Sequence, residues 1–231
     1  DNQQTIIALK KGKEAITLEP GGQIELSGAP LDNIHETCEE TTNHLRELKK
    51  LGNELNFILL GMGVEPNLGL DDFPWMPKQR YGIMKKYMKK VGTLGHHMMK
   101  RTCTNQVNID YSSEEDMVEK FRIMLNLEAI ATAMFSNSPF DQGKISKYKS
   151  LRSHFWHNTD ADRTGLLPFV FEKDFNFENY ANYAWNVPMY FINRDNKYID
   201  MTQYTFKDYL EGKSNNIKHE ATLKDWEDHL T

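Results

Sequence analysis

The sequence is poor in cysteine and has no long apolar run. Its 231 residues contain two cysteines, Cys38 and Cys103, too few for a disulfide framework, so a reducing cytosol is the expected environment. No apolar stretch reaches the roughly 18 residues of a transmembrane helix, and residues 1–4 form no apolar targeting segment. These absences predict a cytoplasmic chain without a membrane anchor. If the chain is a piece of a longer protein, they say nothing about the rest of it.

An excess of basic residues is missing too. Lys and Arg number 28 against 33 Asp and Glu, which gives a net charge of −5 and argues against a general nucleic-acid binder. The chain has neither a Walker-type phosphate loop nor a Rossmann glycine fingerprint. With 26% charged and 39% hydrophobic residues it is typical of globular proteins, and its length fits one large domain or two small ones with a sizeable core.

The periodic segments predict an α+β protein with an antiparallel sheet flanked by helices. Strands are expected at residues 5–10, 14–19, 23–27, 57–63, 101–111, 187–193 and 197–200, because of alternation, short apolar runs and turn residues between neighbours. Helices are expected at residues 33–55, 80–91, 113–126, 128–135, 177–185, 205–211 and 222–229, with Asp32, Ser112 or Ser113, and Asn176 at the N-terminal ends. Residues 64–79 and 136–165 are expected to be largely loop.

Two of the expected strands carry polar side chains along one face. Gln23, Glu25 and Ser27 alternate with Ile24 and Leu26, because side chains of a strand point alternately to its two faces. The second strand has polar residues at every even position from 102 to 110, and none of them is lysine. Carboxylates and short amides gathered on one face favour a sheet that binds a polar ligand or a metal.

Four motifs resemble one known family. Glu19–Pro30, Arg101–Asp110, Leu151–Gly165 and Val187–Phe191, in this order, look like glutamate–cysteine ligase of the plant and proteobacterial type. The resemblance implies that residues 1–231 are a single catalytic domain, the central portion of a longer enzyme with further strands on both sides. It also implies an incomplete fold of the glutamine-synthetase type, in which the polar face of an antiparallel sheet binds the ligands.

The first motif holds the expected metal ligands. Magnesium takes carboxylate oxygens and commonly shares substrate phosphates, so Glu25, with Glu19 as a second candidate, is expected to bind Mg²⁺, and Gln23 to bind ATP or substrate beside it. From the residues alone, a Glu facing solvent on an edge strand is an equal alternative.

The second motif holds neutral donors and acceptors. Thr104, Gln106 and Asn108 suit a nucleotide or amino acid, since further carboxylates would repel phosphate, and Arg101 at the end of this strand is expected to attract ATP. The alternative is a polar ladder between strands.

The third motif contains two arginines in one expected loop. The planar fork of arginine matches carboxylate or phosphate, and the resemblance implies that Arg152 and Arg163 bind the α-carboxylate of glutamate or the transferred phosphoryl group. Trp156 and, from the fourth motif, Tyr190 with its neighbours Met189 and Phe191 are expected to line a substrate pocket. The alternative is a surface loop whose arginines pair with Asp160 and Asp162.

The resemblance thus implies ATP-dependent joining of the glutamate γ-carboxylate to the cysteine amine through γ-glutamyl phosphate, the first step of glutathione synthesis. It implies Mg²⁺ and ATP, the small-molecule substrates glutamate and cysteine, no nucleic acid and no membrane, and leaves a homodimer open. The location would be bacterial cytoplasm, or the plastid for a plant-like source. Two alternatives remain: a carboxylate–amine ligase with another amine, and a catalytically incomplete fragment that only binds a ligand. Cys38 matches a position that plant relatives use in a regulatory disulfide, but is expected here to be a small buried residue.

Overall fold

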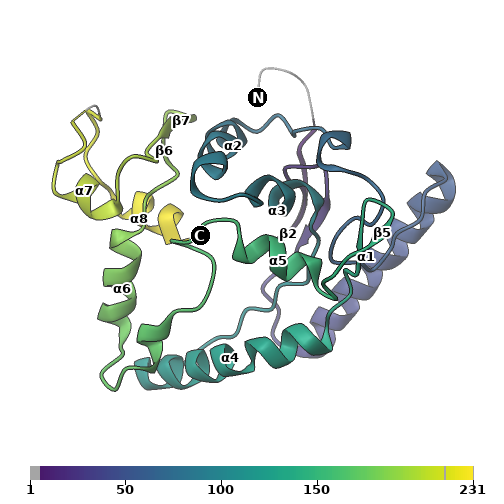
Figure 1. Cartoon of the computed structure of the whole chain (residues 1–231), viewed down its shortest axis with the longest axis horizontal. Helices are drawn as coiled ribbons and strands as arrows, with labels where there is room; N and C mark the ends of the chain where they lie inside the picture. The colour runs from purple at the N-terminus through teal and green to yellow at the C-terminus, as the bar shows by residue number, and fades with distance from the viewer. Residues whose placement is uncertain (1–5, 216, 231) are drawn as a thin grey trace.

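The computed structural model describes residues 6–215 and 217–230 and confirms the α+β class. Helices and three small antiparallel sheets alternate along the chain (Figure 1). The helices are α1 Ile34–Leu55, α2 Gln79–Val91, α3 Gly95–Arg101, α4 Glu114–Met134, α5 Leu151–His157, α6 Phe177–Asn186, α7 Phe206–Leu210 and α8 Leu223–Leu230, with the short 3₁₀ helices η1 Leu70–Asp72 and η2 Pro168–Phe171. Among the described helices, none is both long and apolar enough to cross a membrane.

The largest described sheet has the order β1-β2-β3 and is antiparallel throughout. Its strands are Ala8–Lys11, Glu14–Leu18 and Ile24–Ser27. The turn from β1 to β2 has Gly12 at φ +60°, a left-handed conformation that glycine adopts without a steric cost. The two expected hairpins are therefore confirmed, the second as β6 Phe191–Arg194 with β7 Lys197–Asp200. A small pair, β4 Phe140–Asp141 and β5 Lys144–Ile145, lies between them in the sequence.

Capping side chains set the starts of several helices. Ser113 and Asn176 accept hydrogen bonds from the backbone N–H groups of the first turns of α4 and α6, as predicted; such caps satisfy donors that have no partner within the helix. α1 is capped by Asn33 rather than by Asp32. The two helices expected at residues 113–135 are one continuous helix, α4.

Two expected strands and one expected loop are corrected. Residues 57–63 form no strand, and Phe57 and Leu60 are exposed. Helix α3 occupies residues 95–101, and residues 103–111 run on without strand pairing. Only Val64 and Thr102 form an isolated antiparallel bridge here. The pattern of alternation was present at residues 101–111, but a ladder also needs a neighbouring strand, and none of the described strands lies beside it. The expected loop at 136–165 contains α5, β4 and β5.

Many of the buried apolar side chains gather in three clusters. Met189, Ile192, Met201, Phe206 and Tyr209 gather where β6, β7, α7 and α8 meet. The other two lie under α2, α3 and α5, and consist of Val64, Leu151 and Phe155, and of Tyr81, Met88 and Met99.

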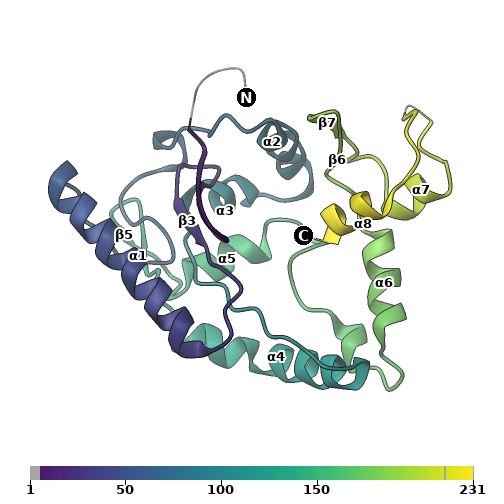
Figure 2. The ribbon, with the colours of Figure 1, turned by 180° about the vertical axis from the view of Figure 1, so that it is seen from behind.

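Both views place α1 along one edge of the molecule and α4 along the lower edge (Figures 1 and 2). Their apolar stripes are left exposed, with Leu55, Ile130 and Met134 at least 55% accessible. Cys38 on α1 is exposed as well, so the expectation that it is buried is wrong. No described element covers that face of the helix.

Candidate functional site

Helix α5 positions Arg152 and Trp156 one turn apart on the same side. Ser150 caps the helix by accepting from the backbone N–H of Ser153, and Ser138 Oγ accepts from the backbone N–H of Arg152 at 3.1 Å. Leu151 and Phe155 on another face are buried, so the core fixes the rotation of the helix. Residues four apart lie one above the other on a helix, which brings the two side chains together.

Two buried nitrogen atoms of this pair have no partner among the described residues. Arg152 Nε and Trp156 Nε1 are buried and make no hydrogen bond with the residues that the structure describes. The guanidinium lies 5.4 Å from the centre of the Trp156 ring, and within the described part of the chain no carboxylate forms an ion pair with it. Burial lowers the pKa of Arg152, opposed by Cys103 nearby, although arginine stays charged at neutral pH. A half-buried cation with unused donors is suited to bind an anion.

The segment after α3 passes beside this pair. Cys103 is close enough that Arg152 lowers the pKa of its thiol, against a larger rise caused by burial. The next residue, Thr104, is exposed and donates to the carbonyl of Asn105. Gln106 and Asn108 are exposed, and Gln106 Nε2 donates a hydrogen bond to Asn108 Oδ1 at 3.1 Å. They therefore stand on an unpaired extended segment rather than on the second strand that the sequence predicted.

Glu19 and Glu25 lie close to the beginning of α2. Burial lowers the pKa of Lys78, and Glu19 and Glu25 both act to raise it; burial and the same two carboxylates raise the pKa of Tyr81. Glu25 accepts from Ser27 Oγ and Glu19 from Thr17 Oγ1, each at 3.4 Å. Both carboxylates thus act on the same two side chains, Lys78 and Tyr81, and their role as metal ligands stays a prediction.

Cations opposite the carboxylates were missed by the sequence reasoning. Arg80 lies 5.4 Å from the centre of the Tyr81 ring and Lys78 at the same distance. The basic character of residues 80–91 was visible, but the proximity of their first turn to Glu19 depends on tertiary packing. Nowhere in residues 6–215 and 217–230 do three acidic, histidine or cysteine side chains gather as a metal-binding group.

Gln23 occupies a different position from the one expected. Its Nε2 donates to the carbonyls of Met99 and Thr102, at 3.0 and 3.1 Å, and its Oε1 accepts from the backbone N–H of Gly21 at 2.8 Å. Both amide donors are thus used inside the protein, and the expected ligand role of Gln23 stays a prediction.

Arg163 is also engaged internally. Its Nη1 donates to Asp160 Oδ2 at 2.8 Å, its Nη2 donates to the carbonyl of Pro188, and its guanidinium lies 3.9 Å from the centre of the Tyr190 ring. Asp160 is 2% exposed, and burial raises the pKa of Tyr190. The two arginines therefore differ. The surface-loop alternative, with pairing to Asp160, fits Arg163, whereas Arg152 remains available for a ligand.

Arg101 is not placed to attract a ligand from solvent. It is 1% exposed, forms a 2.7 Å ion pair with Asp141 and donates to His97 Nδ1, assigned as the acceptor, and to the carbonyl of Glu65. Met189, expected to line the amine pocket, is fully buried in the core. Both side chains are therefore packed inside the fold, and their expected ligand roles stay predictions.

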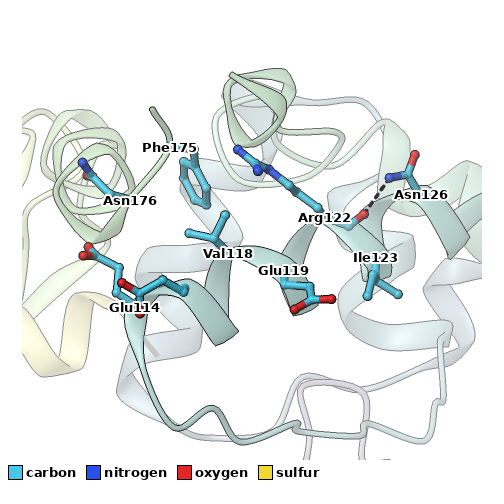
Figure 3. Close-up of a pocket in the computed structure, with 9 residues that line it drawn as sticks. Glu114, Val118, Glu119, Arg122, Ile123, Asn126, Phe175 and Asn176 are labelled. Atoms are coloured by element: carbon cyan, nitrogen blue, oxygen red, sulfur yellow. Dashed lines mark hydrogen bonds between the residues drawn. The ribbon is translucent and has the colours of Figure 1, made fainter. Parts of the chain in front are cut away.

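One pocket lies away from these residues. A pocket of about 530 Å³ opens between the first half of α4 and the loop before α6. Figure 3 shows Val118 and Phe175 on its inner side, with Glu114 and Glu119 beside them. Arg122, which also lines the pocket, donates to the backbone carbonyls of Val170 and Glu172. None of the site residues expected from the sequence lines this pocket.

Known proteins give an independent comparison. The model of glutamate–cysteine ligase family 2 matches residues 3–231. Among curated proteins, the chain is 57% identical to the chloroplastic glutamate–cysteine ligase of Medicago truncatula, over 98% of this chain and 45% of the relative. It is 56% identical to that of Arabidopsis thaliana, over 98% and 44%, and 55% identical to chloroplastic glutamate–cysteine ligase B of Oryza sativa subsp. japonica, over 99% and 46%.

The chain thus spans less than half the length of these relatives. The match nevertheless covers nearly all of its own residues, including the four motifs from which the resemblance was inferred. The chain belongs to glutamate–cysteine ligase family 2.

Proposed function

We propose that this chain is the substrate-binding part of an ATP-dependent glutamate–cysteine ligase, the enzyme that makes γ-glutamylcysteine. Membership of the family supports the reaction class. The observation that carries the proposal is the pair of buried donors without partners, Arg152 Nε and Trp156 Nε1. An amino-acid substrate carries a carboxylate that can accept both hydrogen bonds. Each charge-assisted bond of this kind is stronger than one between neutral groups.

The reaction needs ATP because a carboxylate is a poor acyl donor. An oxygen of the glutamate γ-carboxylate attacks the γ-phosphorus of ATP, and ADP leaves with the electrons of the broken P–O bond. The amine of cysteine then attacks the acyl carbon of γ-glutamyl phosphate. Phosphate leaves, the amine loses a proton, and the amide remains. Such chemistry depends mainly on holding the reactants in place and on neutralising charge.

The residues of this chain have separate roles in that scheme. Arg152 and Trp156, both on α5, bind the α-carboxylate of glutamate. Thr104, next to Cys103, offers a neutral hydroxyl to the same substrate. Gln106 and Asn108 extend this polar surface toward the nucleotide or the second amino acid. Tyr190 remains our candidate for a wall of the amine pocket, since its ring lies over Arg163 at the entry to β6.

Glu19 and Glu25 are the residues that would hold Mg²⁺. Their oxygens are hard ligands, the hydroxyls of Thr17 and Ser27 lie beside them, and two carboxylates suit a cation that keeps water and shares substrate phosphates. The bound cation would neutralise phosphate charge. Arg80 and Lys78, near the same carboxylates, would attract the nucleotide to this face.

At a coarser level, the α+β fold agrees with this assignment. We further propose that β1-β2-β3 is part of a larger sheet of the glutamine-synthetase type, and that residues 1–231 form one catalytic unit. The names of the relatives favour the plastid over the cytoplasm as the location. A homodimer stays open.

A binding experiment tests the proposal. Isothermal titration of the purified chain with glutamate should give saturable binding that is lost in Arg152→Met. It should be retained in Arg46→Met, which changes an exposed arginine on α1. Equal affinity in all three proteins would refute the site. The alternative is a ligase for a different amine. It is tested with an active enzyme of the family that carries these residues, by measuring phosphate release with cysteine and with other amino acids.

A further inference from the structure

The turn before β3 is fastened to the end of α3 by one side chain. The final carbonyls of a helix have no donor within the helix, and the Gln23 amide supplies two hydrogen bonds there, to Met99 and Thr102. The same amide accepts from the backbone of Gly21, so its orientation is fixed from both ends.

The approach of the two segments is close along the backbone as well. A Cβ added at Gly21 would lie 2.3 Å from the carbonyl oxygen of Lys100, so a glycine is required there. The backbone N–H of Met76 donates to the carbonyl of Pro20 at 2.9 Å. The turn that joins Glu19 to Glu25 is therefore packed directly on α3.

From this contact a continuous path leads to Arg152. Thr102, whose carbonyl accepts from Gln23, precedes Cys103, and the backbone N–H of Cys103 donates to the carbonyl of Gly63 at 3.1 Å. A Cβ added at Gly63 would be 3.4 Å from Arg152 Cδ, so this backbone lies against the arginine side chain. The contacts from Gln23 to the Arg152 side chain therefore pass through Thr102, Cys103 and Gly63.

We propose that Gln23 is a positioning residue that couples the two halves of the site. Its amide holds Glu19 and Glu25 at a fixed separation from Cys103, Thr104 and Arg152. Binding of Mg²⁺ with nucleotide at the carboxylates therefore strengthens glutamate binding at Arg152. This inference rests on the proposed function, because it takes the two faces to be the nucleotide and glutamate sites.

The test is the coupling between two ligands in the intact chain. Isothermal titration measures the dissociation constant of glutamate with and without saturating Mg–ADP. In the unchanged protein Mg–ADP should tighten glutamate binding by about five-fold or more, the lower end of usual couplings between sites. In Gln23→Met, which keeps the length of the side chain but removes the amide, the factor should fall to within about two-fold of unity, while each ligand alone still binds.

Two further variants serve as controls for this measurement. Gln203→Met removes an exposed glutamine and should keep the coupling of the unchanged protein. If Gln23→Met shows no cooperative unfolding transition, Gln23→Asn replaces it, since this variant keeps an amide but withdraws it by one methylene and should also lose the coupling.

The outcomes distinguish failure of the positioning role from failure of the proposed function. A Gln23 variant that folds and retains the full coupling overturns the positioning role, and so does an unchanged protein in which the two ligands bind independently. If neither glutamate nor Mg–ADP binds the unchanged protein, the proposed function fails, and the inference that rests on it fails too.

Discussion

At the scale of single residues, Arg152 and Arg163 show how one side-chain type serves two purposes. Both lie in the same motif and were predicted to bind anions. Arg163 donates to Asp160 and Pro188 and lies over the Tyr190 ring, whereas Arg152 keeps a buried donor without a partner among the described residues. The sequence indicated that this motif holds two arginines suited to an anion. It could not separate the arginines, because the difference depends on which carboxylate the fold brings within reach.

The first prediction concerns the fork of Arg152. Arg152→Lys keeps the charge but loses the planar pair of donors, so it should weaken glutamate binding by about one to two decades. Losing a charge-assisted hydrogen bond costs roughly 1.5–3 kcal/mol, and about 1.4 kcal/mol corresponds to one decade. Titration calorimetry measures the change. Unaltered affinity in the Lys variant would mean that Arg152 acts only as a diffuse charge or not at all.

The second prediction concerns the exposed carboxylate of Glu25. Glu25→Gln keeps the size of the side chain and removes the charge that a hard cation requires. Binding of Mg–ADP should be severely reduced, while the melting temperature stays near that of the parent, because Glu25 is exposed. Ser27→Ala, which removes only a 3.4 Å contact to this carboxylate, is the matched control. Normal nucleotide binding at saturating Mg²⁺ excludes Glu25 as a ligand.

At the scale of elements, local signals and tertiary packing contributed separately. The start of α6 at Asn176 and the β6–β7 hairpin were predictable because a cap and a turn are formed by neighbours in sequence. The turn between those strands has Asp195 and Asn196 at positive φ, which these residue types tolerate. The alternation at residues 101–111 misled, because α3 extends to Arg101 and residues 103–111 lack a partner strand.

The third prediction concerns the ion pair between Asp160 and Arg163 within the loop after α5. Asp160→Asn leaves the partly buried Arg163 without its carboxylate, so it should lower the free energy of unfolding by about 1–3 kcal/mol, the usual cost of a donor that loses its partner. Chemical denaturation measures this loss. The exposed pair of Lys50 with Glu54 offers a control, since Glu54→Gln should change stability by less than about 1 kcal/mol. Equal effects of both variants would contradict an internal role for Asp160.

At the scale of the whole molecule, the described surface is unusually apolar along α1 and α4. Ile34, Leu55, Ile130 and Met134 are exposed on these helices, and the chain spans under half the length of its curated relatives. The sequence predicted the family, and the metal role of Glu19 and Glu25 stays a prediction. It could not predict which apolar faces stay uncovered, because burial depends on what packs against them.

The fourth prediction is that the 231-residue chain alone forms no γ-glutamylcysteine from Mg–ATP, glutamate and cysteine. Among the described residues two carboxylates face the expected metal position, and Mg²⁺ bound by so few protein ligands is held weakly. Chromatographic assay of the product measures this, with an active family enzyme as positive control. Robust turnover would show that residues 1–231 contain a complete catalytic site.

The most direct test of the central claim follows the indole N–H of Trp156 during a glutamate titration. The chain has four tryptophans, and Trp156→Phe assigns the relevant proton–nitrogen resonance in an NMR spectrum. Because Trp156 Nε1 has no acceptor in the described structure, its resonance should move on binding of glutamate, with saturation, and should stay unchanged in Arg152→Met. Glutamate that binds with full affinity while the Trp156 resonance stays fixed would contradict the claim that α5 holds the substrate carboxylate.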